Sequence, residues 1–136
     1  MILMDKAAEQ AVIAGVLRHG VDAYYDVADI VTPDTFTDGT NRILYSCLRH
    51  NIEKHDIAHV DIPSLYSAAQ ELGYGGMISS PDHSKYLQKL SDTPVYEKNV
   101  RKFGAKIRKL EVGRLLNNQL SEAQDRVQAI SGDERS

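Results

Sequence analysis

Apolar residues recur every three or four positions along most of the chain, and the interruptions between these stretches carry residues that begin or end helices. In the first stretch, residues 6–19, Val12 and Val16 lie on one helical face. Asp5 is placed to cap the first turn, and Gly20 follows the last apolar position. This pattern predicts a first helix over residues 6–19.

The same pattern predicts a series of short helices up to residue 90. They are expected over residues 22–31, 39–50, 62–72 and 84–90, with one further turn around Phe36 after Pro33. Residues 51–60 have no sustained periodicity and predict a loop, and the glycine- and serine-rich segment 73–82 predicts an exposed connection. The expected core residues are Val12, Val16, Phe36, Leu44, Leu48, Leu65, Leu87, Leu90, Phe103 and Ile107.

The last segment, residues 95–130, differs from the others in its length. The residues in it that disfavour a helix are Gly104 and Gly113, and a helix tolerates single glycines. A helix of that length spans roughly 50 Å at 1.5 Å per residue, which exceeds the width of a small helical head. We therefore expect an all-α fold in one domain, with a globular head of short helices at residues 1–94 and a long projecting arm at residues 95–136.

Two apolar stripes run along this predicted long helix. The first consists of Val100, Phe103, Ile107 and Leu110. The second consists of Val112, Leu116, Leu120, Ala123, Val127 and Ile130. At about 100° per residue the centres of the stripes lie roughly 165° apart, on nearly opposite faces. The first is expected to pack on the head, and the second is expected to be an oligomer interface, buried against a returning helix, another subunit, or both.

Composition limits the classes of protein that fit. The 136 residues include 42% hydrophobic and 26% charged residues with a formal charge of −3, which fits one soluble globular domain. A negative net charge gives no general attraction to phosphates, so strong direct nucleic-acid binding is not expected. No apolar run is long enough to cross a bilayer, and the single Cys47 cannot form an internal disulfide. A cytoplasmic location without membrane contact is expected.

A basic cluster occupies the first part of the predicted long helix. Its lysines and arginines lie between residues 98 and 109, mostly away from the first stripe. Such a face suits an acidic protein partner or a phosphate backbone, but it is also the ordinary solvated side of an amphipathic helix. The candidate partner-docking face consists of Arg101, Lys102, Arg108 and Lys109.

Histidines and acidic residues crowd residues 50–61. The residues His50, His55, Asp56, His59 and Asp61 are of types that bind metals, and the His-Asp dipeptide resembles the signature of HD-type phosphohydrolases. In that class the ligands come from separate helices, whereas here they share one predicted loop and lack two histidines four residues apart on a helix. We therefore expect exposed polar residues and no metal site. A metal-dependent hydrolase is the one enzymatic alternative.

Other catalytic signatures are missing from the sequence. It contains no Gly-Lys dipeptide and hence no G-x-x-x-x-G-K-[ST] phosphate loop, and it lacks G-x-G-x-x-G, G-x-S-x-G and C-x-x-C. We expect no catalytic residue, no cofactor, and no binding or hydrolysis of ATP by this chain.

Several short motifs occur together in the order found in the N-terminal domains of DnaB-type replicative helicases. The segment Glu9–Leu17, EQAVIAGVL, resembles the family's opening "E-Q-A-V-L-G-x-x-L". Later matches are Asp34 and Phe36, Asn41-Arg42-Ile43, Asp61-Ile62 with Leu65, Gly73, Tyr86-Leu87, Thr93-Pro94 with Asn99, and Ile107-Arg108. Together they cover about residues 8–116. Because most of them are core or cap positions, the resemblance concerns fold first and function by association.

The resemblance implies a non-catalytic assembly and docking domain. Such a domain has a helical head followed by a helical hairpin, through which subunits pair and form a collar on the helicase ring, and it receives primase and helicase-loading proteins. It implies a homo-oligomer, a dimer for this chain and a hexamer for the parent helicase, whose motor domain would bind ATP and Mg²⁺. The alternative is a stand-alone adapter, such as a primase-type helicase-binding domain or a phage protein that captures a host helicase.

The sequence departs from the family pattern in two places. Glycines and serines at 73–80 lengthen the connection before Tyr86, which indicates a divergent member such as a phage-encoded one. The chain ends at Ser136, where a second hairpin arm, a linker and a motor would follow. We therefore expect a fragment in preference to a free-standing relative, with the hairpin turn at Gly132-Asp133.

Overall fold

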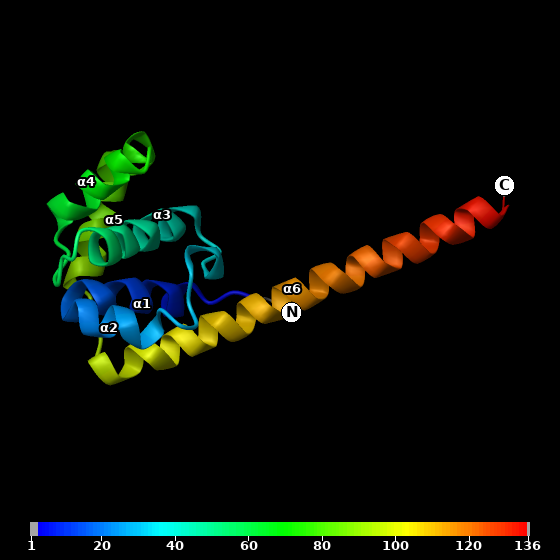
Figure 1. Ribbon diagram of the computed structural model, residues 1–136, viewed down its shortest axis with the longest axis horizontal. Helices are drawn as coiled ribbons and strands as arrows, with labels where there is room; N and C mark the ends of the chain where they lie inside the picture. The colour runs from blue at the N-terminus through cyan, green and yellow to red at the C-terminus, as the bar shows by residue number, and fades with distance from the viewer. Residues whose placement is uncertain (1–2, 136) are drawn as a thin grey trace.

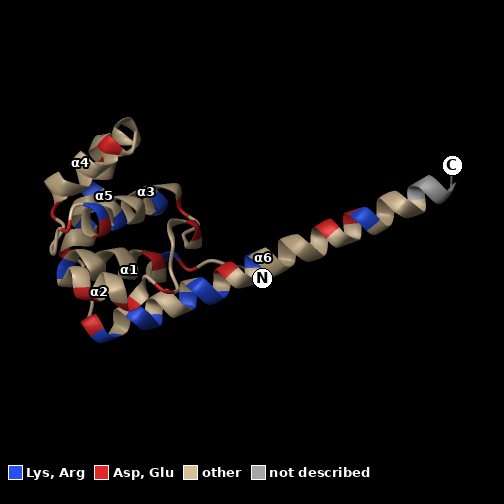
Figure 2. Cartoon of the chain, viewed as in Figure 1, with Lys and Arg blue, Asp and Glu red and all other residues tan. Residues whose placement is uncertain are grey.

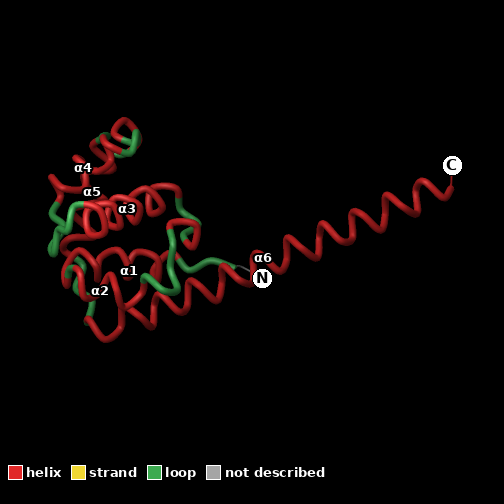
Figure 3. The backbone as a smooth tube through the Cα atoms, viewed as in Figure 1, coloured by secondary structure: helices red, strands yellow, loops and turns green. Residues whose placement is uncertain are grey.

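The computed structural model describes the backbone of residues 3–135 and the side chains of residues 3–131, and it contains only helices and their connections within that range. Short loops join the helices (Figure 3). The α-helices are α1 (Lys6–His19), α2 (Val21–Val27), α3 (Gly39–Arg49), α4 (Ile62–Glu71), α5 (Pro81–Asp92) and α6 (Glu97–Arg135). The single turns are η1 (Pro33–Thr35) and η3 (Gly75–Met77), both 3₁₀, and η2 (His50–Lys54), a π-helix.

The helices form a head from which one helix projects. Helices α1 to α5 gather into a compact group, and α6 runs along one side of this group and then far beyond it (Figure 1). This arrangement agrees with the all-α fold and with the expected head and long helix. The predicted hairpin turn at Gly132-Asp133 is wrong, because α6 continues as helix to Arg135. A single glycine within a helix costs only about 1 kcal/mol, which the rest of the helix offsets.

Aspartate and serine side chains begin four of the helices. In each, a side-chain oxygen accepts a hydrogen bond from the backbone N–H three residues later, which satisfies a donor that the helix itself cannot pair. Each cap of this kind contributes about 1 kcal/mol. The four pairs are Asp5 with Ala8, Asp38 with Asn41, Asp61 with Ser64, and Ser80 with His83.

The core lies where α1 meets the other helices. Of the ten expected core residues all are buried except Phe103, which is half-buried at the edge of the core. The aromatic rings of Phe36 and Tyr45 pack with centroids 5.0 Å apart. The Tyr45 hydroxyl donates to the carbonyl of Val31, so this buried polar group has a partner. The short helices therefore share one contiguous core.

A buried carboxylate joins α1 to the start of α3. The Glu9 side chain is only 1% exposed, yet it accepts hydrogen bonds from the Thr37 backbone N–H at 3.1 Å and from the Asn41 side-chain amide at 3.3 Å. A buried carboxylate is tolerated only when such donors replace its water. The pairing explains why the motif that opens at Glu9 has an acidic residue on a face that is otherwise apolar.

Three segments differ from the predicted elements. Helix α2 ends at Val27 instead of residue 31, because Val31 turns into the core. The predicted loop at 51–60 begins with η2, which the buried Asn51 holds in place, as described below. Helix α5 begins at Pro81, three residues earlier than predicted, because Ser80 caps it and proline is favoured at the first helical position.

Candidate interaction surface

Helix α6 has two parts that differ in their surroundings. Its first part, from Glu97 to about Arg114, lies along α1 and α2, whereas its second part extends away from the head (Figure 1). Val100 and Ile107 are fully buried in the first part. From Leu115 to Ser131 every side chain is exposed. The head therefore holds only the first part of the helix.

Two glycines allow the first part of α6 to approach the head closely. A Cβ atom on Gly15 of α1 would lie 2.5 Å from a methyl carbon of Val100. A Cβ atom on Gly104 of α6 would lie 2.8 Å from a methyl carbon of Val27. Both distances are too short for a real side chain, so the packing requires glycine at each position. The sequence indicated only that Gly104 is tolerated, whereas the packing depends on it.

The buried face of α6 is also rotated relative to the predicted first stripe. Val100 and Ile107 are buried as expected, but Phe103 and Leu110 lie half-exposed at the flank. Gly104 and Glu111 are the other buried positions on this face. A hydrophobicity pattern misses them because one has no side chain and the other is charged.

A polar cluster around Glu111 forms the last contact of α6 with the head. The Thr35 hydroxyl and the Arg108 guanidinium both donate to the Glu111 carboxylate at 2.8 Å. One turn further, Arg114 donates to the carbonyl of Leu3 at 2.6 Å and to the carbonyl of Thr35 at 3.1 Å. These charge-assisted bonds are roughly twice as strong as neutral ones. They fix the point at which the helix leaves the head.

From Leu116 onward the predicted second stripe lies beyond this point, and all its residues, including Val112 just before it, are exposed. The exposed fractions are 38% for Val112, 55% for Leu116, 62% for Leu120, 62% for Val127 and 59% for Ile130. Ala123 is exposed as well, and it contributes with Leu120 and Val127 to a shallow hollow. A row of large apolar side chains of this kind on one helix face is typical of a surface that another helix covers.

Leu115 extends this apolar surface beyond the predicted stripe. Its side chain is 50% exposed, and at about 100° per residue it lies next to Leu116 on the neighbouring face. The sequence analysis missed it because it falls outside the regular spacing of the stripe. Its exposure in the structure is the signal that identifies it.

The second part of α6 carries few charges. Between Leu115 and Ile130 the charged residues are Glu122, Asp125 and Arg126, and the other polar positions are mainly asparagine and glutamine. Figure 2 shows this part as mostly uncharged, whereas the first part carries a run of basic residues. An apolar centre flanked by neutral polar residues is the composition of a protein–protein interface.

The predicted partner-docking face divides into paired and exposed residues. Arg101 donates to the carboxylate of Asp29 at 2.9 Å, and this contact lowers the pKa of Asp29 below its usual value. Arg108 binds Glu111. Lys102 and Lys109 are exposed and take part in no ion pair within the described residues.

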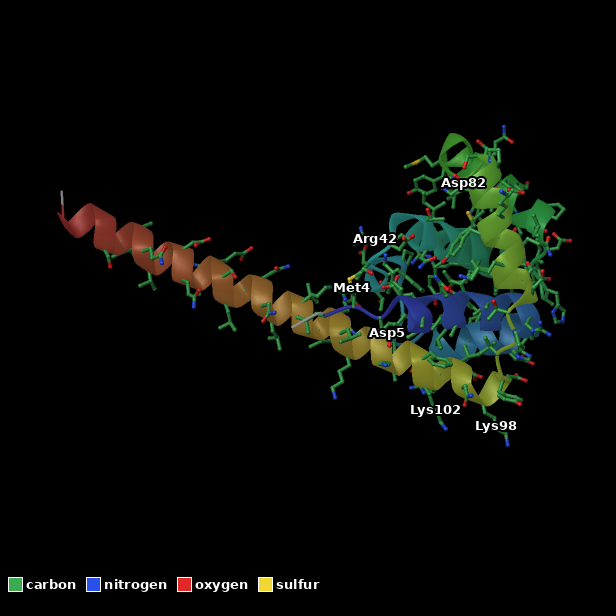
Figure 4. The ribbon with its side chains drawn as sticks, turned by 180° about the vertical axis from the view of Figure 1, so that it is seen from behind. Met4, Asp5, Arg42, Asp82, Lys98 and Lys102 are labelled. Carbon is green, nitrogen blue, oxygen red and sulfur yellow. The ribbon has the colours of Figure 1, made fainter. Side chains whose placement is uncertain are left out.

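The side of α6 away from the head carries these exposed lysines. Figure 4 shows Lys98 and Lys102 extending from α6 on that side. Within the described residues, Lys102 and Lys109 are therefore the members of the predicted docking face that are exposed and outside ion pairs, with the exposed Lys98 beside them, whereas Arg101 is exposed but paired.

The histidines of residues 50–61 occupy different surroundings. His50 and His55 both approach Glu71, at the end of α4, a residue that the sequence analysis did not consider. His59 lies against Gly20 instead, and Asp61 caps α4. Of the five residues singled out in this segment, His50 and His55 therefore meet at Glu71, whereas Asp56, His59 and Asp61 lie outside this cluster.

A comparison with protein-family models and a comparison with solved structures each give a match for this chain. The family model described as "DnaB-like helicase N terminal domain" matches residues 3–109. A solved structure with a similar fold is the N-terminal domain of DnaB helicase from Mycobacterium tuberculosis, with a TM-score of 0.71 and 24% sequence identity over 91% of this chain and 83% of that chain. No curated protein sequence matches the chain. Within the described residues, no helix is both long and apolar enough to span a membrane.

Proposed function

The chain belongs to the family of DnaB-like helicase N-terminal domains, and on that premise we propose that it is the assembly and docking domain of a replicative DNA helicase. In this role it pairs subunits and receives a primase or a helicase loader. The ATP-driven motor of the parent protein would lie on a separate domain. The proposal makes the chain itself non-catalytic.

The observation that carries the proposal is the exposed apolar stripe on the second part of α6. The stripe is apolar along one face and has neutral polar residues beside it, and the partner that we propose for it is the same stripe of another copy. A two-fold contact satisfies both copies at once, because each then presents and receives the same surface. Burying one large aliphatic side chain contributes roughly 1.5–3 kcal/mol. Four or five such residues per subunit offset the entropic cost of association at micromolar concentration.

A second surface supports docking of other replication proteins. Lys102 and Lys109 are exposed on the first part of α6, away from the stripe. Their charge suits an acidic segment of a primase or loader, and complementary charge mainly speeds association and selects partners. Because the head holds this part of the helix, a partner docked there leaves the pairing stripe free.

The test compares two double variants in sedimentation. Leu116→Asp with Leu120→Asp places two charges in the stripe and is expected to convert a dimer into a folded monomer. Asn118→Asp with Ser121→Asp adds the same charge on the opposite face of the same turns, and it is expected to leave the dimer intact. Circular dichroism of both variants checks that α6 and the head remain helical.

Two results would contradict the pairing role. One is a wild-type chain that stays monomeric at high micromolar concentration. The other is a Leu116→Asp/Leu120→Asp variant that unfolds, which would place the stripe in the core of the head. Equal dissociation of the two double variants would assign the effect to charge alone.

The absence of motor activity is a separate part of the proposal. The sequence contains no phosphate-binding loop, so purified chain is expected to show no ATP hydrolysis above background. Hydrolysis that co-purifies with the protein through a gradient step would contradict this expectation.

A further inference from the structure

The π-helix η2 places two histidines on the same side of the chain. His50 and His55 are five residues apart, and in an α-helix such residues face about 140° away from each other. The i to i+5 pattern of a π-helix brings them together instead. Their rings lie 4.9 Å apart between centroids, at an angle of 83°. The sequence analysis looked for histidines at α-helical spacing and therefore excluded a site here.

A buried asparagine fixes this local geometry. The side-chain amide of Asn51 donates to the carbonyls of Cys47 and Ser64, both at 3.0 Å, and the backbone carbonyl of Asn51 accepts from the Ile57 backbone N–H at 3.0 Å. Asn51 is 3% exposed. Because Ser64 belongs to α4, the same residue that shapes η2 also holds it against the helix that ends in Glu71. Short π-helical segments of this kind occur frequently at functional sites.

Glu71 completes a cluster of three side chains from two elements. Its Oε2 atom lies 2.7 Å from the Nε2 atom of His50 and 2.9 Å from the Nε2 atom of His55. The three ligand atoms all lie within 4.8 Å of one another. We propose that His50, His55 and Glu71 bind one zinc-class divalent metal ion through two imidazole Nε2 atoms and one carboxylate.

The distances and the exposure of the side chains fit such an ion. Ligand atoms around tetrahedral zinc at about 2.0–2.1 Å stand roughly 3.3 Å apart, so the Glu71 oxygen has to move away from each histidine nitrogen by about half an ångström. Glu71 is the last residue of α4, with 47% of its side chain exposed, and His55 is 40% exposed. Both can therefore adjust. His50, with 12% exposure, is the fixed ligand.

The ligand types and the hollow beside His50 favour a zinc-class ion. A hollow beside His50 is lined by Ser46, Arg49, Leu72 and Tyr74, and it leaves room for a water molecule or a hydroxyl as the fourth ligand. Two imidazoles suit Zn²⁺ and its transition-metal neighbours. The bound ion would clamp η2 to the end of α4.

The test measures metal binding by the full chain and by three single variants. Zinc sulfate is titrated by calorimetry after EDTA treatment and dialysis, and Co²⁺ is used as a spectroscopic probe of a low-coordinate site. The wild type is expected to bind one Zn²⁺, to gain several degrees in Tm, and to lose this gain in EDTA. His55→Ala and Glu71→Gln are expected to lose about tenfold or more in affinity, as even outer-shell substitutions do. His59→Ala removes an exposed histidine of the same segment outside the cluster and is the matched control.

Separate results would overturn the proposal of a metal site. No saturable Zn²⁺ binding by the wild type would do so. Equal loss of affinity in His55→Ala and His59→Ala would also do so, because it would indicate unspecific histidine binding. Unchanged affinity in Glu71→Gln would remove the carboxylate from the ligand set. Sedimentation of the same variants is expected to be unchanged, so this test does not depend on the pairing role of α6.

Discussion

The two parts of α6 share one helix but differ in what surrounds them. The first part buries Val100 and Ile107 against the head and continues to the polar cluster around Glu111. The second part exposes an apolar stripe of similar residue types, with Leu120 and Val127 each 62% exposed. Residue type alone therefore does not decide whether a position on this helix stabilises the head or is available to a partner. What decides is whether a neighbouring element can approach closely.

The difference lies in the glycines and the polar contacts. In the first part, Gly104 lets Val27 approach α6, and Lys106 forms an ion pair with Asp5 at the start of α1. The second part has no equivalent contacts with the head among the described residues. Substitutions in the first part should therefore change the stability of the head, whereas those in the second part should change association.

The largest expected effect compares two apolar truncations. Ile107→Ala removes a fully buried side chain and is expected to destabilise the head by about 2–5 kcal/mol. Val127→Ala removes an exposed one and is expected to change the stability of the monomer by less than about 0.5 kcal/mol. Urea unfolding of both, measured in the Leu116→Asp/Leu120→Asp background to exclude dimers, checks the contrast. Similar losses for the two variants would remove the distinction between the two parts.

The next effect compares two glycines of the same helix. Gly104→Ala forces a Cβ atom against Val27 and is expected to destabilise the head by about 1–3 kcal/mol. Gly113→Ala meets Leu3 at an ordinary contact distance, and it should stabilise the helix by up to about 1 kcal/mol. The two substitutions are thus expected to have opposite signs. Thermal unfolding of each variant measures them, and a loss in both would show that the close approach is not specific to Gly104.

A smaller effect concerns the ion pair that ties α6 to the start of α1. The hydrogen bond from Lys106, followed by that from the Ala8 N–H, lowers the pKa of Asp5 below its ordinary value of 3.8. A carboxyl with a lowered folded-state pKa stabilises the fold above its unfolded value, and this contribution is lost as pH falls through the folded value. Lys106→Met is therefore expected to cost up to about 1 kcal/mol at neutral pH.

The pH dependence supplies the control for that substitution. The difference in stability between wild type and Lys106→Met should be complete above about pH 4 and should shrink as the pH falls further. Unfolding curves at a series of pH values measure it. A difference that stays constant down to pH 2 would mean that Lys106 contributes through packing and not through Asp5.

The smallest expected effect on stability concerns the exposed lysines. Lys102→Glu with Lys109→Glu should alter stability by no more than about 0.5 kcal/mol and should leave the dimer intact. The same change is expected to weaken docking of an acidic partner, with most of the loss in the association rate. Surface plasmon resonance with purified primase or loader measures this. Unchanged binding would exclude this face as the docking surface.

Much of the fold could be predicted from the sequence because it depends on local rules. Asp5 was placed as a cap by its position before an apolar run, and it accepts the expected hydrogen bond from the Ala8 backbone N–H. The length of α6 followed from the scarcity of breakers. The exposure of the second stripe followed from the length of α6, which carries most of these residues beyond the head.

The remaining features depend on contacts between distant residues. The burial of Glu9 requires donors from the segment before α3, and the burial of Gly104 requires Val27 of α2. Neither is visible in a periodic pattern. The meeting of His55 with Glu71 needed both an unusual helical turn and a residue from the next helix. The spacing of residues along the chain predicts neither the π-helical turn nor the contact between His55 and Glu71.

The continuity of α6 has a mechanical consequence. No break separates the part held by the head from the part that projects. The helix therefore moves as one rigid rod, which the head holds between Val100 and Arg114. The free end extends about 30 Å beyond Arg114, and a tilt of about 10° at the head displaces it by about 5 Å. In the same way, a small tilt of the far end of α6 rotates the head. Two copies joined at their free ends would thus be coupled in orientation, with no contact between their heads.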